Sequence, residues 1–248
     1  MEYRVLGKTG LKISRLGFGG IPIQRIDAEG TKILIHKLHD SGVNFIDTAR
    51  GYTVSEEYLG YALEGIRQDF VLATKSMSRD KANMARDIDI SLKNLRTDYI
   101  DLYQIHNATV AQLDQVAAPG GALEALLEAR QQGKIGHIGI TLHAEDLFKK
   151  AVDFDWVETI MFPYNLVETQ GEKLIKVCAQ KGIGFIVMKP LAGGAIEDPT
   201  LALRFIMANP DVSVVIPGMA AEKELKQNIA AVEDTSPLTA EENAKILE

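Results

Sequence analysis

The sequence predicts an α/β protein folded as a closed (β/α)8 (TIM) barrel. Short β-like runs alternate with amphipathic helical stretches, and their starts lie about 28 residues apart, close to one βα unit. The eight runs begin near Leu16, Asn44, Phe70, Tyr99, Ile135, Thr159, Gly184 and Val212. An open doubly wound sheet commonly carries a GxGxxG turn after its first strand. Residues 17–20 read GFGG and lack that spacing, so the closed barrel is the better prediction.

The segment before the first barrel strand is short and turn-rich. Residues 3–14 contain Lys8-Thr9-Gly10, and we expect them to form a β-hairpin that closes the bottom of the barrel. Several later runs are apolar throughout, among them residues 70–73 and 185–188. Such runs suit parallel strands that are buried on both faces.

The stretches between the strands have helical periodicity. Apolar side chains recur on one helix face, for example at Ile88, Leu92 and Leu95, and at Leu225, Ile229 and Val232. Gly42 and Gly133 follow two of these helices, where a left-handed C-cap favours glycine. Thr239 and Glu242 have capping-box spacing for a last helix. No linker or low-complexity segment interrupts the pattern, so we expect residues 1–248 to form one domain.

Composition narrows the class of protein. The chain carries 27 Lys+Arg against 34 Asp+Glu, a net charge of -7. This argues against nucleic acid or an anionic membrane as the main partner, because both need a basic surface. No apolar run exceeds four residues and the N-terminus has no apolar signal core, so we expect a cytoplasmic protein without a transmembrane helix. The single cysteine, Cys178, excludes an internal disulfide, a cysteine-rich zinc site and an iron–sulfur cluster.

Three consecutive predicted strands end in ionisable residues. The second strand ends at Asp47, with Tyr52 in the following loop; the third ends at Lys75 and the fourth at His106. Barrel enzymes place their catalytic groups at the C-terminal ends of the strands, so we expect these side chains to meet at one rim. Each alone is more often structural or solvated than catalytic, and it is their joint occurrence on adjacent strands that indicates a site.

The four residue types suit proton transfer to a carbonyl oxygen. A buried lysine needs a carboxylate to stay charged, and Asp47 can supply it. The Lys75 cation would then favour tyrosinate and lower the pKa of Tyr52 from about 10. A tyrosine adjusted in this way can donate a proton near neutral pH, while His106 hydrogen-bonds the same oxygen or assists the transfer.

Three segments around these residues form a specific set. Residues 43–49 read VNFIDTA and precede Tyr52, residues 71–75 read VLATK, and residues 99–106 read YIDLYQIH. In these motifs, and over essentially its whole length, the chain resembles the aldo-keto reductase superfamily. The resemblance implies a (β/α)8 barrel, a nicotinamide cofactor extended across the strand ends, no metal, and reduction of a small-molecule carbonyl substrate.

The same resemblance implies a role for each of the four side chains. It assigns Tyr52 as the general acid, Lys75 and Asp47 as the pair that adjusts its pKa, and His106 as the group that orients the substrate. Hydride would pass from C4 of the reduced nicotinamide to the carbonyl carbon, while Tyr52 protonates the oxygen.

The residues of this chain match the family's cofactor site less completely than its four catalytic residues. Gly19 and Gly20 would allow close backbone approach, and the loop 189–194 would hold the pyrophosphate. Where the family often has Ser-Asn the chain has Thr141-Leu142, and Met161 replaces a frequent glutamine. The residues expected to contact the cofactor are Gly19, Gly20, Asp47, Thr141, Asn165, Met188, Lys189, Pro190, Leu191, Gly193, Gly218, Met219, Gln227 and Asn228.

The adenosine end of this implied site departs most from the family. Many NADP-selective members carry Lys and Arg there to bind the 2′-phosphate, and the matching positions here are Gly218 and Glu224. Lys223 and Lys226 lie nearby and are candidate substitutes, whereas Glu224 would repel a phosphate. On family grounds NADP(H) is slightly favoured, and NAD(H) is the alternative.

Two other functions are compatible with the same pattern. One is a nicotinamide-binding barrel that senses redox state and regulates a partner with little turnover. The other is a phosphate-sugar isomerase or lyase on the same fold, which predicts that Tyr52→Phe is tolerated. His36 and His39 share a helix face, but no third ligand accompanies them, so we expect no metal site.

Overall fold

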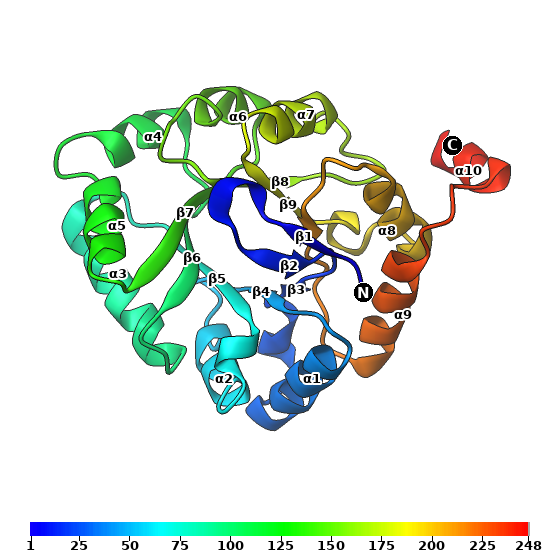
Figure 1. Cartoon of the computed structure of the whole chain (residues 1–248), viewed down its shortest axis with the longest axis horizontal. Helices are drawn as coiled ribbons and strands as arrows, with labels where there is room; N and C mark the ends of the chain where they lie inside the picture. The colour runs from blue at the N-terminus through cyan, green and yellow to red at the C-terminus, as the bar shows by residue number, and fades with distance from the viewer. Residues whose placement is uncertain (248) are drawn as a thin grey trace.

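The eight predicted strands form one parallel sheet that closes into a barrel inside a ring of helices (Figure 1). The structure, a computed structural model, describes residues 1–247; Glu248, the last residue of the predicted domain, lies outside them. The barrel strands are β3 (Phe18–Gly19), β4 (Phe45–Asp47), β5 (Val71–Ser76), β6 (Ile100–Ile105), β7 (Ile135–Thr141), β8 (Thr159–Pro163), β9 (Gly184–Met188) and β10 (Val214–Val215).

The sheet closes because its last strand also meets its first. Each strand from β3 to β10 pairs with the next in parallel. Parallel bridges then join Leu16 to Val215 and Gly19 to Gly218. The predicted (β/α)8 barrel is therefore confirmed, and the C-terminal ends of all eight strands share one rim.

Helices follow the strands and cover the outside of the barrel. They are α1 (Ala28–Asp40), α2 (Ser55–Ala62), α3 (Lys81–Asn94), α4 (Val110–Ala117), α5 (Ala122–Gln131), α6 (Glu145–Ala151), α7 (Glu172–Gln180), α8 (Pro199–Ala208), α9 (Glu222–Glu233) and α10 (Ala240–Leu247). Asp27, Asp80 and Asp198 cap the N-termini of α1, α3 and α8. Gly42 and Gly133 have φ of 76° and 73° after α1 and α5, as predicted for left-handed C-caps.

The N-terminal hairpin closes the bottom of the barrel, as predicted. Strands β1 (Tyr3–Val5) and β2 (Lys12–Ser14) pair antiparallel and cross the centre of the strand ring in Figure 1. Leu6 and Ile13 are fully buried, in a cluster with Phe45, Ala73, Leu102, Met161, Ile186, Val214 and Ile216. Gly7 sits in the hairpin turn with φ of 52°, and a Cβ there would lie 2.2 Å from the amide nitrogen of Gly184. The hairpin is thus packed directly on the barrel strands.

A second apolar layer fills the space between the strands and the helices. Its largest side chains include Phe148, Phe162 and Phe185, which pack ring against ring. Cys178 is buried in this layer, and burial raises the pKa of its thiol to about 12, which makes the thiol inert. Within residues 1–247, no helix combines the length and apolarity that crossing a membrane requires.

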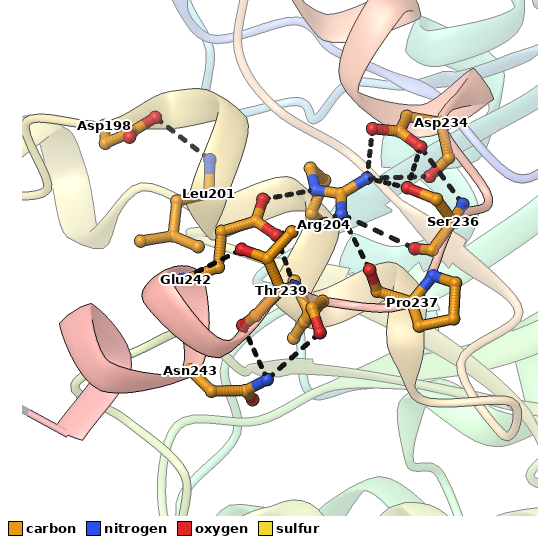
Figure 2. Close-up of polar contacts among 10 residues, drawn as sticks. Asp198, Leu201, Arg204, Asp234, Ser236, Pro237, Thr239, Glu242 and Asn243 are labelled. Atoms are coloured by element: carbon orange, nitrogen blue, oxygen red, sulfur yellow. Dashed lines mark hydrogen bonds and ion pairs between the residues drawn. The ribbon is translucent and has the colours of Figure 1, made fainter.

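Arg204 of α8 ties the C-terminal helix to the barrel (Figure 2). Its guanidinium bonds to Glu242 of α10, with Nε 2.7 Å from Oε1, and pairs with Asp234 just after α9. It also donates to the main-chain oxygens of Asp234 and Pro237. Thr239 and Glu242 exchange hydrogen bonds of 2.7 and 3.1 Å, which confirms the predicted capping box. Helix α10 lies outside the ring of the other helices (Figure 1), and this cluster joins it to α8 and to the chain after α9.

Candidate active site

Three neighbouring strands bring the four predicted side chains together at the C-terminal rim. Asp47 ends β4, Lys75 is the second-to-last residue of β5, and His106 follows β6 directly. Tyr52 lies in the loop between β4 and α2. Lys75 Nζ is 2.6 Å from Asp47 Oδ2 and 4.7 Å from the centre of the Tyr52 ring. The Tyr52 and His106 rings meet edge to face, with centroids 5.9 Å apart.

Lys75 and Asp47 form a buried ion pair, and each residue is 2% exposed. Loss of hydration lowers the pKa of Lys75, but attraction to Asp47 and Tyr52 outweighs it and leaves that pKa above its ordinary value. Lys75 also donates to the carbonyl of Thr48 at 2.8 Å. Burial raises the pKa of Asp47, and Lys75 and Gln104 oppose that rise. The lysine is therefore held as a cation beneath the tyrosine ring.

The pKa of Tyr52 departs from the prediction. We expected Lys75 to lower it below its ordinary value, but burial of the phenol raises it, and the lysine offsets only part of that rise. Asp47 raises the pKa further through its negative charge. The predicted net lowering is wrong because the loss of hydration is the largest contribution. Tyr52 is consequently protonated at neutral pH, which is the state that a proton donor needs.

His106 is neutral. Loss of hydration, followed by the nearby charges of Lys75 and Arg79 and the proximity of His143, lowers its pKa to about 3. Its Nδ1 is buried and accepts no hydrogen bond from the residues that the structure describes. The neutral imidazole has one N–H. Since Nδ1 is buried, Nε2 is the nitrogen that a ligand at the rim can reach.

Two further polar side chains support this site, and the sequence analysis missed both. Gln104 donates from Nε2 to Asp47 Oδ1 at 3.1 Å, inside the barrel. Arg79, in the loop after β5, donates to the main-chain oxygen of His106 at 2.6 Å. Gln104 was open to prediction, because it stands two residues before His106 and so shares its face of the strand. Arg79 carries no such signal, since a loop has no fixed period.

Glu56 joins the elements that carry Tyr52 and Lys75. It lies at the start of α2 and is 1% exposed. Its carboxylate accepts hydrogen bonds of 2.8 Å from Thr74 of β5 and from Ser91 of α3. Arg50 supplies a countercharge at 2.8 Å. This buried network fixes the loop that holds Tyr52 against the strand that holds Lys75.

The predicted cofactor residues near strands β3 and β4 are closely packed. A Cβ on Gly19 would lie 2.9 Å from the main-chain oxygen of Ile216, and one on Gly20 would lie 2.9 Å from that of Asp47. Both glycines are therefore required where the barrel closes.

The loop after β9 suits an anionic group. Lys189, Ala192, Gly193 and Gly194 all have positive φ, between 47° and 101°. Lys189 is exposed, and Pro190 beside it is buried. Left-handed residues occur in the concave turns of backbone that bind anions, but the amides of Ala192 and Gly194 already donate to the carbonyls of Lys189 and Leu191 at 3.0 and 2.8 Å. The loop thus offers the Lys189 cation, and its binding of a pyrophosphate stays a prediction.

Asn165 and Thr141 are already engaged within the protein. Asn165 is fully buried, and its Nδ2 donates to the carbonyl of Lys189 at 2.9 Å and to Glu168 at 2.8 Å. Thr141 Oγ1 accepts from the amide of Asn107 at 2.9 Å. Met188 is half-buried at the end of β9. The predicted contacts of Asn165, Thr141 and Met188 with a nicotinamide stay predictions, and Asn165 has a visible structural role in holding the loop after β9.

The N-terminus of α9 is capped by Glu224. Its Oε2 accepts from the amides of Ala220 and Ala221 at 2.7 and 3.0 Å. Lys226 is turned toward Glu222, at 2.8 Å. The remaining predicted residues of this region are Gly218 and Met219 before α9, the exposed Gln227 and the nearly buried Asn228. This end of the site thus carries a carboxylate where the helix dipole is positive.

The histidines set aside in the sequence lie apart from the rim. His36 approaches the carbonyl of Ala62 at 3.2 Å, and His39 lies 3.2 Å from Asp69. Over residues 1–247, no three His, Cys, Asp or Glu side chains are grouped so that they could hold a metal ion.

Comparison with known proteins agrees with this geometry. A profile described as "Aldo/keto reductase family" matches residues 15–200. L-galactose dehydrogenase of Arabidopsis thaliana is 28% identical over 96% of this chain and 90% of its own. NADH-specific methylglyoxal reductase of Escherichia coli is 24% identical over 92% of each chain. The holo form of an aldo-keto reductase from Bacillus halodurans superposes with a TM-score of 0.88 at 28% identity, covering 100% of this chain and 95% of that one.

The family match and the oxidoreductases among the similar proteins, on a barrel of this fold, define a nicotinamide-dependent oxidoreductase that acts on carbonyl groups. The chain belongs to the aldo/keto reductase family. It is therefore an NAD(P)H-dependent oxidoreductase, as predicted.

Proposed function

We propose that this protein reduces an aldehyde or ketone to the corresponding alcohol, with Tyr52 as the proton donor. The observation that carries the proposal is the position of the Tyr52 phenol, which lies over the Lys75 cation and beside the His106 ring. When bound, the reduced nicotinamide supplies hydride to the carbonyl carbon. The side chains of this rim then have to direct the carbonyl oxygen and protonate it.

Each of the four side chains has one task in this reduction. Neutral His106 donates a hydrogen bond from Nε2 to the carbonyl oxygen and sets its direction. Tyr52 transfers its phenolic proton to that oxygen as negative charge develops there. The Lys75 cation stabilises the tyrosinate that is left behind, and Asp47 keeps Lys75 charged in its buried position. In the reverse reaction the tyrosinate removes the proton from the alcohol.

The residues along the rim fit a nicotinamide dinucleotide. The left-handed turns after β9 and the exposed Lys189 suit the pyrophosphate. At Gly19, Gly20 and Gly218 neighbouring atoms fill the place of a Cβ, at 2.6 to 2.9 Å, so the chain follows the edge of the site without side chains at these positions. Asn228 and Gln227 of α9 are the residues that we assign to the adenine.

We further propose that the protein prefers NAD(H). The sequence resemblance slightly favoured NADP(H), but the Glu224 carboxylate accepts from the amides of Ala220 and Ala221, directly before α9. A 2′-phosphate bound near this end would lie close to that negative charge. Lys226, a candidate phosphate ligand, is turned to Glu222 instead.

A titration and a turnover assay test the two parts separately. We expect the nicotinamide fluorescence of NADH to report tighter binding than that of NADPH. Glu224→Gln keeps a side chain that completes a capping box, so it should tighten NADPH binding and leave NADH binding unchanged. Tighter binding of NADPH to the unaltered protein would refute the proposed preference.

The catalytic part is tested with Tyr52→Phe. This variant should bind NADH normally and lose roughly 10²-fold or more of kcat with generic aldehydes. Tyr61→Phe, which alters a tyrosine on the outer helix α2, is the matched control. Near-normal turnover by Tyr52→Phe would overturn the role of Tyr52. Tight NADH binding without turnover in the unaltered protein would favour a redox-sensing barrel instead.

A further inference from the structure

Arg79 is an almost buried cation without a carboxylate partner among residues 1–247. It is 9% exposed. Its guanidinium bonds only to main-chain oxygens, with Nη2 2.6 Å from that of His106 and 3.1 Å from that of Asn107, and Nη1 3.3 Å from that of Ser78. Burying a charge that lacks a countercharge is unfavourable for stability. Such an arrangement therefore calls for an explanation other than stability.

Two of the carbonyls that Arg79 bonds to, those of His106 and Asn107, belong to a left-handed turn. Asn107 has φ of 50°, a conformation that few residues other than glycine adopt. Its amide donates to the main-chain oxygen of Thr141 at 3.1 Å and to Oγ1 of the same residue at 2.9 Å. Arg79 and Thr141 thus fix this peptide from both sides. The turn begins directly at His106, so its geometry sets the direction of the imidazole.

We propose that Arg79 is a positioning residue for the carbonyl chemistry, because it holds the turn that aims His106 across the Tyr52 ring. The inference rests on the proposed role of His106 and adds a residue to it. Arg79 does not need to touch the substrate, since it acts through the backbone of His106 and Asn107. The hydrogen bonds from Arg79 and to Thr141 hold the turn in one conformation, so the imidazole is oriented before a substrate binds.

The positive charge of Arg79 supports the same role as its hydrogen bonds, because it affects the protonation of His106. The charged and titratable groups around His106 are Lys75, Arg79, His143 and Tyr52. Positive charge disfavours the imidazolium, so Arg79 helps to keep the ring neutral with a free acceptor at Nδ1. Removal of Arg79 should therefore raise the pKa of His106 as well as loosen the ring.

The test compares two substitutions of Arg79. Arg79→Met removes both the positive charge and the hydrogen bonds of the guanidinium. We expect kcat to fall about 10-fold or more while the dissociation constant of NADH is unchanged. Arg79→Lys keeps the charge but not the two-pronged geometry, so it should keep the imidazole neutral and recover only part of kcat. Arg86→Met, which removes an exposed arginine of α3, is the matched control.

A second-site substitution separates positioning from general instability. Asn107→Gly removes the cost of the left-handed turn, so in the Arg79→Met background it should restore part of kcat. The histidine NMR spectrum supplies a reading that does not depend on turnover: in Arg79→Met the His106 resonances should broaden and titrate at higher pH. Unchanged kcat and unchanged His106 resonances in Arg79→Met would overturn the proposal. If the unaltered protein has no turnover, the proposed function fails, whereas the NMR comparison still decides whether Arg79 holds His106.

Discussion

The ammonium nitrogen of Lys75 lies 4.7 Å from the centre of the Tyr52 ring. This is cation–π distance, and the same ammonium bonds to Asp47 at 2.6 Å. The cation therefore faces the tyrosine with its charge preserved. As the phenolic proton leaves, attraction to the tyrosinate grows, so Lys75 stabilises the later state more than the earlier one.

Replacement of Lys75 by methionine should impair proton transfer in both directions. We expect kcat to fall by roughly 10²–10³-fold. In alcohol oxidation, where tyrosinate is the base, the acid limb of the pH profile should move to higher pH, because loss of the cation raises the pKa of Tyr52. Lys173→Met on the outer helix α7 is the control, and an unshifted acid limb in Lys75→Met would contradict the assignment.

Replacement of Gln104 by leucine should separate activity from stability. The change removes the hydrogen bond to Asp47 and also the buried Oε1, which has no partner among the described residues. Removal of a buried unsatisfied polar atom offsets the lost bond, so we expect the thermal midpoint to stay within a few degrees while kcat falls about 10-fold. Parallel measurement of both quantities tests this, and a large loss of stability would show that Gln104 serves the core instead.

Acid should destabilise the protein through His106. Its pKa is lowered to about 3 in the folded state, against 6.5 for an ordinary histidine. Between these values the unfolded chain binds a proton that the folded chain does not, so the stabilising contribution is present above about pH 6.5 and is lost as the pH falls toward 3. Urea unfolding at pH 7 and pH 4.5 should show the loss.

The variant His106→Gln gives the matching comparison. It should lose less stability than the unaltered protein over the same pH interval. Equal pH dependence in His106→Gln and the unaltered protein would refute the assignment of this titration to His106.

Arg204→Met should release helix α10 without affecting the reaction. The substitution removes the bonds to Glu242 and to the main chain after α9 (Figure 2). We expect stability to fall by about 2 kcal/mol, as for lost hydrogen bonds between charged groups. Hydrogen exchange should accelerate in residues 240–247, and turnover should be unchanged. Protection of α10 equal to that of the unaltered protein would show that apolar packing is its main attachment.

Most of the barrel was open to prediction because its signals are local. The parallel strands are short apolar runs, as at residues 185–188, and the caps at Gly42 and Thr239 depend on a few neighbouring residues. The rim residues followed from the rule that strand ends carry the chemistry. The sequence resemblance then supplied the family.

The environment of each side chain was harder to predict. The pKa of Tyr52 depends on how far burial outweighs Lys75, and a sequence does not state that balance. Asn165 binds the carbonyl of Lys189, 24 positions further on, and Arg79 holds the left-handed turn at Asn107. Both contacts arise from where separate loops meet over the barrel, which local patterns do not encode.

The N-terminal hairpin, which closes the bottom of the barrel, also limits the route by which a ligand can reach the rim. Leu6 and Ile13 fill the lower end with apolar side chains, so a ligand of the rim enters and leaves on the side where the strands end. Under the proposed reduction, substrate and alcohol product would use this same side in turn. Slow release of the alcohol would then delay binding of the next substrate molecule and limit the rate of turnover.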